Sequence, residues 1–294
     1  MSLTFKAGDL TIHRVIEQET TFLPATEMMP GLTPEVLAEN RSWMQAAKAL
    51  DANDVLILCF QSYVVKTPHH TILIDSCIGN DKPRPNRPKW NMKTDDTYMR
   101  ALAAAGVSVA DIDYVMCTHL HVDHVGWNTK LDNGRWVPTF PNAKYVFSQI
   151  DRDYWDPAKN PDLDEEARMI FADSVHPVIA SGQDHLVADG DRLGDNLAIQ
   201  LTPGHTPGAV AIRLTDGGQE GLFTGDVMHH PIQVYRPCWS SRFCTDPVQS
   251  ADTREKVLGQ CADCNALMLP AHFGAPHAGR VRRKGDGFFF AFEE

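Results

Sequence analysis

The sequence predicts an α/β (α+β) fold built as a four-layer αβ/βα sandwich. Short β-branched segments alternate with helical ones and gather into two strand-rich halves. Each half contains a hairpin whose second strand ends in aspartate, at Val64–Asp75 and at Val210–Asp226. A length of 294 residues, 43% of them apolar, is ample for a buried core. We therefore expect two sheets packed face to face, with helices outside and the loops of both halves meeting along one edge.

The first half begins with a predicted hairpin. Val55–Lys66 and Thr71–Asp75 are apolar, β-branched runs separated by a turn. Asp95–Ala105 has helical spacing, starts with two aspartates and stops before a glycine. Ile112–Cys117 and Ala143–Phe147 are typical of short buried strands, and a helical stretch rich in Asp and aromatic residues follows the second.

The second half combines several strands with one long helix. We expect a helix at Asp246–Cys264, because Asp246 is a favourable N-cap and Pro247 suits the first turn. Pairs of Gly and Pro residues separate the strands. The predicted strands are Leu197–Leu201, Ala209–Leu214, Gly221–Thr224 and Asn265–Leu269.

Two Pro-rich segments that also carry apolar residues, Thr20–Trp43 and Ile78–Lys93, are predicted to be irregular. They are interpreted as lids over a site or as a homodimer contact, and equally well as ordinary surface loops. We expect one domain over residues 1–294. It divides into an N-terminal extension or lid at 1–50, a metal-binding core at 51–275 and a C-terminal tail at 276–294.

The composition excludes several classes of protein. The formal charge of 27 − 38 = −11 is unsuited to binding nucleic acid, and the run Arg280–Lys284 is interpreted as part of a solvated tail. No apolar run approaches the roughly 18 residues of a membrane span, and Met1–Leu10 lacks a signal-peptide pattern. The 7 cysteines, an odd number, favour reduced thiols over disulfides. These observations predict a cytoplasmic protein that binds neither nucleic acid nor membrane.

The clearest chemical signal is the segment Thr118–His124, which reads Thr-His-Leu-His-Val-Asp-His and directly follows a buried strand. In an extended turn, His119 and His121 point to one side, and Asp123 and His124 face a neighbouring position. Imidazole and carboxylate are ligands that zinc prefers. The segment therefore predicts a site for two adjacent cations.

This His-x-His-x-Asp-His motif resembles that of the metallo-β-lactamase superfamily, and later positions extend the resemblance from about residue 55 to 275. The superfamily places a histidine in a Gly/Pro-rich turn, where this chain has His205. An aspartate at the end of the next hairpin is matched by Asp226, and a final histidine after a strand by His272. Asp75 matches the first motif, which has a supporting part.

The resemblance implies a complete dinuclear centre. Asp226 would bridge two Zn²⁺ ions per chain, although the same ligands accept Mn, Fe or Co. A hydroxide shared by the metals would attack an ester-like carbonyl, and Asp123 or Asp226 would carry its proton. Asp75 would hold the histidine loop in place. The implied ligands are His119, His121 and His205 for one metal, and Asp123, His124 and His272 for the other.

Within the superfamily, the chain most resembles the branch of N-acyl homoserine lactonases, pyridoxolactonase and methyl parathion hydrolase. A bridging Asp226 disfavours true β-lactamases, and His121 disfavours the diiron oxygen-reducing branch, which has an acidic residue there. The quorum-quenching lactonases carry Tyr three residues after the bridging aspartate, whereas this chain has His229. His229 is interpreted as a donor to the substrate carbonyl or, alternatively, as a surface-loop histidine.

The leading hypothesis is a dinuclear zinc hydrolase that opens lactones or cleaves small carboxylic esters. The alternative is a phosphotriesterase-like or promiscuous ester hydrolase on the same metals. Other classes are an iron-dependent oxidoreductase of the sulfur dioxygenase type and a non-catalytic metal-binding protein; the complete ligand set disfavours both. The expected partner is a small-molecule substrate in an apolar pocket. Candidate pocket residues are Met28, Met29, Trp90, Trp127, Trp239, Phe243 and Phe273.

Overall fold

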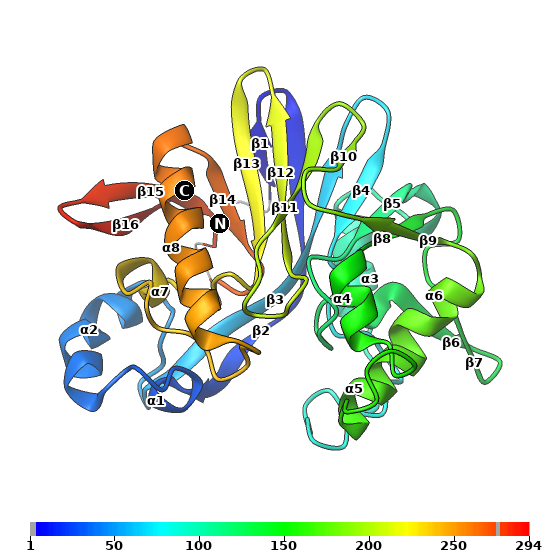
Figure 1. The fold of residues 1–294 in the computed structure, drawn as a ribbon, viewed down its shortest axis with the longest axis horizontal. Coiled ribbons are helices and arrows are strands. Elements are labelled where there is room, and N and C mark those ends of the chain that lie inside the picture. Colours follow the sequence, from blue (N-terminus) through cyan, green and yellow to red (C-terminus); the bar gives the residue numbers. More distant parts are fainter. Residues whose placement is uncertain (1–3, 275–276, 294) are drawn as a thin grey trace.

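The computed structural model describes residues 4–274 and 277–293, and its two large sheets face each other in the middle of the molecule (Figure 1). Each sheet has 7 strands. Helices cover the outer face of both sheets, so the layers run helix, sheet, sheet, helix (Figure 1). The predicted α/β sandwich is confirmed.

The first sheet has the strand order β1-β2-β3-β4-β5-β8-β9. Strands β1 to β4 pair antiparallel, whereas β4, β5, β8 and β9 run parallel. The long β2 follows almost the whole of β3, and a bulge at Glu17 shifts its register. The strands are β1 (Thr4–Ala7), β2 (Leu10–Pro24), β3 (Val55–Lys66), β4 (Thr71–Ile74), β5 (Tyr114–Met116), β8 (Lys144–Ser148) and β9 (Asp184–Val187).

The second sheet has the order β10-β11-β12-β13-β14-β15-β16 and is antiparallel except for the parallel pair β13 and β14. A separate hairpin joins β6 (Thr129–Asp132) and β7 (Arg135–Pro138). The strands of the second sheet are β10 (Arg192–Leu193), β11 (Leu197–Leu201), β12 (Val210–Asp216), β13 (Gln219–Gly225), β14 (Leu267–Pro270), β15 (Gly279–Lys284) and β16 (Gly287–Phe292).

The helices fall into two groups beside the sheets (Figure 1). The predicted N-cap of the longest one is confirmed, because Asp246 accepts hydrogen bonds from the backbone N–H groups of Val248 and Gln249. None of the described helices is long and apolar enough to cross a bilayer. The helices are α1 (Ala25–Met28), α2 (Pro34–Ala46), α3 (Thr97–Ala104), α4 (Gln149–Trp155), α5 (Glu165–Ile170), α6 (His176–Ala180), α7 (Ile232–Tyr235) and α8 (Pro247–Cys264). Short 3-10 turns lie at Val109–Asp111 and Gly126–Asn128, and a π-helical turn at Phe171–Val175.

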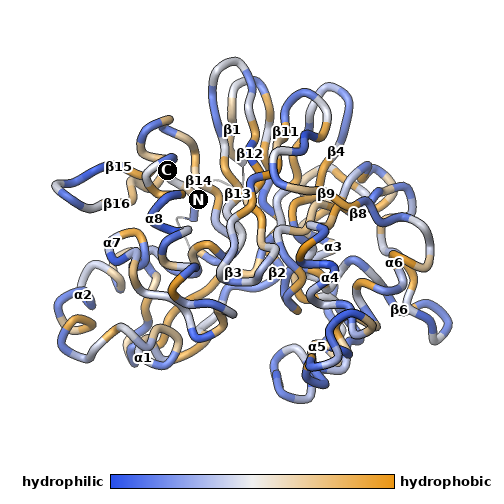
Figure 2. The backbone as a smooth tube through the Cα atoms, in the orientation of Figure 1, coloured by the Kyte–Doolittle hydropathy of each residue, from blue (hydrophilic) through white to orange (hydrophobic). Residues whose placement is uncertain are grey.

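Apolar side chains form three cores, which Figure 2 shows as hydrophobic strands inside a more polar periphery. The middle core joins the sheets, with Val65 from one and Ile212 and Phe223 from the other. The first sheet buries its outer face against a second core, and the third core lies between the second sheet and α8. Hydrophobic burial on both faces therefore holds each sheet in place.

The structure differs from the sequence-based expectation in its terminal segments. Thr20–Trp43 is largely regular, because β2 pairs with β3 as far as Pro24 and Thr33 caps α2. Residues 1–50 thus contribute β1 and β2 to the first sheet instead of forming only an extension. The expected tail contains the hairpin β15–β16, in which Val281 is buried between outward-facing arginines. Ala275 and Pro276, where the predicted core and tail meet, lie outside the described residues, whereas Ile78–Lys93 is irregular as predicted.

Candidate metal centre

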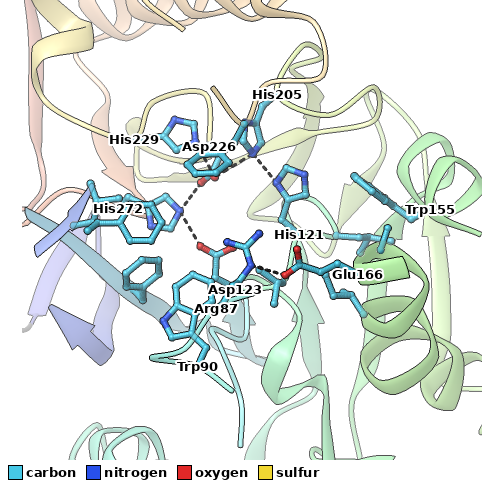
Figure 3. Close-up of a pocket in the computed structure, with 18 of the residues that line it drawn as sticks. Arg87, Trp90, His121, Asp123, Trp155, Glu166, His205, Asp226, His229 and His272 are labelled. Carbon is cyan, nitrogen blue, oxygen red and sulfur yellow. Dashed lines mark hydrogen bonds and ion pairs between the residues drawn. The ribbon is translucent and has the colours of Figure 1, made fainter. Parts of the chain in front are cut away.

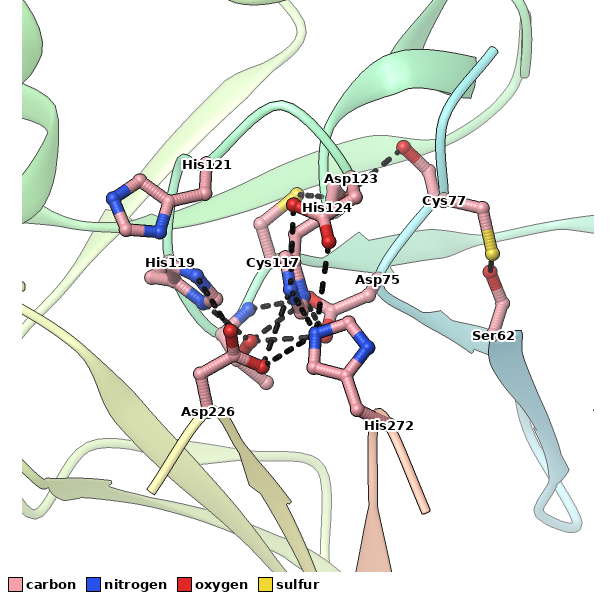
Figure 4. A network of polar contacts seen from close by, with 12 residues as sticks. Ser62, Asp75, Cys77, Cys117, His119, His121, Asp123, His124, Asp226 and His272 are labelled. Atoms are coloured by element: carbon pink, nitrogen blue, oxygen red, sulfur yellow. Dashed lines mark hydrogen bonds and ion pairs between the residues drawn. The ribbon is translucent and has the colours of Figure 1, made fainter. Parts of the chain in front are cut away.

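The predicted ligands converge where β5, β11, β13 and β14 end. Figure 4 shows the ligands other than His205 gathered around Asp226. Because these strand ends meet at one edge, loops far apart in the sequence become neighbours. The ligand atoms form two groups, each within 4.8 Å: His119, His121, His205 and Asp226 in the first, and Asp123, His124 and His272 in the second. The structure therefore brings together all seven ligands that the sequence predicts.

Asp226 faces both groups with different oxygens. Its Oδ2 lies 3.2 Å from Nε2 of His205 and 3.7 Å from Nε2 of His119. Its Oδ1 lies 2.9 Å from Nε2 of His272 and 3.3 Å from Nε2 of His124. A carboxylate in this position can bind one cation through each oxygen.

The donor set fits two divalent cations. Nε2 of His119 is buried without a hydrogen-bond partner, and Nε2 of His205 lies only 2.8 Å from Nδ1 of His121. Buried nitrogens in native proteins normally have a partner, so a cluster of nitrogens that face one another needs a cation or a proton between them. Borderline nitrogen and oxygen donors suit zinc, manganese, iron or cobalt.

Most of the histidines are oriented through their other ring nitrogen, as metal ligands commonly are. Nδ1 of His124 lies 2.9 Å from Oδ2 of Asp75, and the same carboxylate accepts a hydrogen bond from the backbone N–H of Thr118 at 2.7 Å (Figure 4). Nδ1 of His272 lies 2.9 Å from the carbonyl oxygen of Cys59 on β3. The site is therefore held by strands of both sheets.

The protonation of the site follows from burial and from Asp226. Burial lowers the pKa of His119 and His121 well below the ordinary value, and neighbouring imidazoles add to the effect. Burial opposes ionisation of Asp226, but the surrounding imidazoles, His272 first, hold its pKa well below the usual range. Burial would lower the pKa of His272, but Asp226 raises it. Asp226 is thus ionised, and its charge attracts the positive charge that cations would supply.

Asp151 on α4 is a residue that the sequence reasoning missed. Its buried carboxylate accepts hydrogen bonds from the backbone N–H of Leu120 at 2.9 Å and of Gly208 at 3.1 Å. It thereby ties the ligand loop after β5 to the loop that carries His205. A lone aspartate in a helical stretch gives no sequence signal for this role.

The sequence profile of the metallo-β-lactamase superfamily matches residues 61–272, which is well over half of the chain. The chain belongs to the metallo-β-lactamase superfamily. A relative in Azorhizobium caulinodans, the N-acyl homoserine lactonase AttM, is 29% identical over 134 residues, which are 43% of this chain and 46% of AttM. The uncharacterized YobT of Bacillus subtilis is 33% identical over 130 residues, which are 44% of this chain and 52% of YobT. The match thus spans about half the length of these curated relatives.

Among solved structures, the dizinc quorum-quenching lactonase AidC is similar over 99% of this chain and 97% of its own, with a TM-score of 0.81 and 22% identity. The hydrolase AbOPH is similar over the same shares, with a TM-score of 0.83 and 22% identity. At this level of identity, the likeness shows the superfamily fold.

A pocket of about 180 Å³ opens beside the two ligand groups of this superfamily site (Figure 3). One wall is aromatic and aliphatic and comes from β2, β3 and the Ile78–Lys93 loop; the other comes from α5 and the π-helical turn. Arg87 from that loop donates a hydrogen bond to Glu166 on α5 at 2.6 Å and so connects the two walls (Figure 3). The lining includes Phe22, Met28, Leu58, Phe60, Trp90, Trp155, Ile170, Phe171, Val175 and Phe243. We call this space the metal pocket.

Of the aromatic residues expected in the metal pocket, Phe243 and Trp90 line it, whereas three others lie elsewhere. Trp127 stacks on Tyr98 and donates its indole N–H to Glu17 at 2.9 Å. Phe273 packs in the core behind the second sheet, and Trp239 packs against the backbone at Gly31. For Trp127 and Phe273, closeness to a ligand in sequence failed as a guide, because side chains that are neighbours along the backbone point to different faces.

His229 lies at the site and not on the surface, which excludes the surface-loop interpretation. Its Nε2 is 3.2 Å from Oδ2 of Asp226 and 3.3 Å from Oγ of Ser241, and its ring lines the metal pocket. Nδ1 of His229 is buried and has no hydrogen-bond partner among the described residues. Burial lowers the pKa of His229 to about 4, although Asp226 opposes this. A neutral imidazole therefore faces the pocket.

Proposed function

We propose that this protein is a metal-dependent hydrolase that uses a dinuclear centre, with zinc as the expected metal, to open lactones or cleave small carboxylic esters. The observation that carries the proposal is the position of Asp226, which directs one oxygen at each of two ligand groups. A one-metal oxidoreductase has no need for the second group. The membership in the superfamily and the lactonase AttM among its relatives support the same reaction class.

The residues that would hold the cations are the two groups already described. His119, His121 and His205 would bind one metal, Asp123, His124 and His272 would bind the other, and Asp226 would bind both. Divalent cations in such a site activate water for attack and polarise the carbonyl of an ester. The surrounding apolar walls exclude bulk water and strengthen these electrostatic effects.

The chain itself supplies proton transfer and orientation. Asp123 is the more accessible carboxylate at the centre, because its side chain is 14% exposed and that of Asp226 is 5% exposed. It is therefore better placed to accept a proton from water and to return it to the leaving group. His229, where the lactonases have Tyr, turns Nε2 toward the centre, 3.2 Å from Oδ2 of Asp226, so this nitrogen would donate its N–H to the substrate carbonyl when cations occupy the carboxylate. Phe22 and Met28, from the N-terminal segment, act as part of the lid over the reacting group.

Acid release from a panel of substrates tests this function. Zinc-loaded protein and a chelator-treated sample are mixed with lactones, aryl esters and phosphotriesters, and a pH indicator follows the reaction. Chelator-sensitive turnover of lactones or esters is the expected result. Turnover of phosphotriesters alone would favour the alternative hydrolase, and no turnover with any substrate class would contradict the proposal.

Metal analysis of Asp226→Asn tests the bridging position. The amide removes the negative charge shared by both groups, so we expect the variant to lose bound metal and activity together. Asp132→Asn, on the exposed β6–β7 hairpin, is the matched control and should keep both. If Asp226→Asn bound about two metal ions per chain, as expected for the wild type, and kept full activity, the bridging assignment would be refuted.

A further inference from the structure

A second hollow of about 460 Å³ adjoins the metal pocket on its outer side. It lies between the end of β2, the Ile78–Lys93 loop and the segment before α8. Its lining residues are Thr20, Phe22, Leu23, Asn86, Arg87, Pro88, Lys89, Trp90, Arg242 and Phe243. We call this hollow the outer groove.

The outer groove and the metal pocket share a wall, because four residues line both: Phe22, Arg87, Trp90 and Phe243. The ring of Phe22 is central among them, with its centroid 6.1 Å from those of Trp90 and Phe243. A substrate that reacts at the ligand groups and reaches the groove would pass between these rings.

The charged residues that line the outer groove are all cations: Arg87, Lys89 and Arg242. This contrasts with the net charge of −11 for the chain. Nζ of Lys89 donates a hydrogen bond to the carbonyl oxygen of Thr21 at 3.0 Å and forms no ion pair among the described residues. An ammonium group has three donors, so Lys89 keeps two for a ligand.

Each of the two arginines also has N–H donors that its ion pair does not use. Arg87 reaches Glu166 through Nε, and Arg242 reaches Glu27 through one Nη. Neither carboxylate lines the outer groove. Because a guanidinium has five N–H donors, each arginine can bind a second acceptor without losing its pair.

We propose that the outer groove binds the distal end of the substrate and selects for a carboxylate there. The inference rests on the proposed hydrolase function and names its substrate class: an ester or lactone with an apolar chain that ends in an anionic group. The chain passes between Phe22, Trp90 and Phe243, and the carboxylate meets Lys89, Arg87 and Arg242. Apolar walls bind the methylene chain, and the cations reject a chain that ends in another cation.

Pairs of esters that differ only at the distal end test this selection. The para-nitrophenyl esters of hexanoic and octanoic acid are compared with the mono-para-nitrophenyl esters of adipic and suberic acid, which carry a terminal carboxylate. We expect the wild type to prefer the acidic ester of at least one length. In the double variant Lys89→Gln/Arg242→Gln, kcat/KM for that ester should fall about tenfold, while kcat/KM for the neutral ester should change by less than about twofold. Lys130→Gln, an exposed lysine on β6, is the control and should change neither.

A binding experiment separates this inference from the hydrolase function. Metal-free protein is titrated by calorimetry with monomethyl suberate and with dimethyl suberate, neither of which requires turnover. Tighter binding of the monomethyl ester, weakened by salt and by the double substitution, supports the groove even if no ester is hydrolysed. Equal binding of the two compounds, or equal kcat/KM for acidic and neutral esters with active enzyme, overturns it.

Discussion

The substitution Asp173→Asn should weaken the fold more than any exchange of a surface carboxylate. Asp173 lies in the π-helical turn and accepts hydrogen bonds from both Nη groups of Arg84, at 2.7 and 2.8 Å. Nζ of Lys82 lies 3.6 Å from the same carboxylate, and both cations are about 1% exposed. Removing the negative charge leaves two buried cations with no counterion among these neighbours, because an amide cannot neutralise them.

The expected cost is large and depends on pH. Removing one partner of a buried ion pair costs about 3–5 kcal/mol in free energy of unfolding. Burial lowers the pKa of Lys82 to about 7, although Asp173 opposes this. Above pH 7 the unfolded chain, in which Lys82 has its ordinary pKa, therefore binds more protons than the folded protein. The contribution of Lys82 to the free energy of unfolding thus rises with pH in this range. At about pH 9 Lys82 is neutral in the folded protein and only Arg84 loses a partner, so the cost should be smaller than at about pH 6.

Urea unfolding followed by tryptophan fluorescence measures this cost at both pH values. Asp153→Asn is the matched control, because Asp153 is 36% exposed and pairs with Lys159 at the surface. Such a pair contributes less than about 1 kcal/mol. The same small loss in both variants, or a cost that grows with pH, would refute the reasoning. KM should also rise in Asp173→Asn, because this ion pair joins the two walls of the metal pocket.

Two further predictions concern the ligand loops. Asp75→Asn removes the carboxylate at 2.9 Å from Nδ1 of His124, and metal affinity should fall about 10–100-fold. Competition with a chromogenic chelator measures it, and unchanged affinity would show that Asp75 does not orient the ligand. Gly204→Ala should destabilise the loop before His205, because a Cβ at φ +126° would lie 2.2 Å from the backbone nitrogen of Ser250. In thermal unfolding, the melting temperature of this variant should be lower than that of Gly182→Ala, because Gly182 also has a positive φ but has open space around it.

The ligands could be predicted from the sequence because each lies at the end of a recognisable strand. The dense segment Thr118–His124 identifies the first loop, and His205, Asp226 and His272 follow strands in the expected order. Strand ends are positioned by the backbone hydrogen bonds of the sheets, so local patterns were sufficient. The internal hairpins and the cap of α8 are predictable for the same reason.

The walls of the metal pocket could not be predicted in this way. Phe22 and Phe60 lie far from the ligands in the sequence and reach the site only through the packing of β2 on β3. The outer strands were also missed, although alternation gave some signal. In Gly279–Lys284, Val281 alternates with arginines, and Gly285 precedes the second strand, which is typical of a hairpin. The charge of the run outweighed that alternation in the sequence-based interpretation.

The division of ligands between the sheets links the metal centre to the fold itself. The loop after β5 supplies His119, His121, Asp123 and His124, whereas the second sheet supplies the remaining ligands. Asp151 connects the loops of both halves by hydrogen bonds, and the middle core presses the sheets together. Cations bound by both halves would stabilise only the arrangement in which the sheets are packed, and so would raise stability by mass action. Conversely, any cavity made in the middle core should weaken metal binding, because it loosens the contact that brings Asp226 to the ligands of the other sheet.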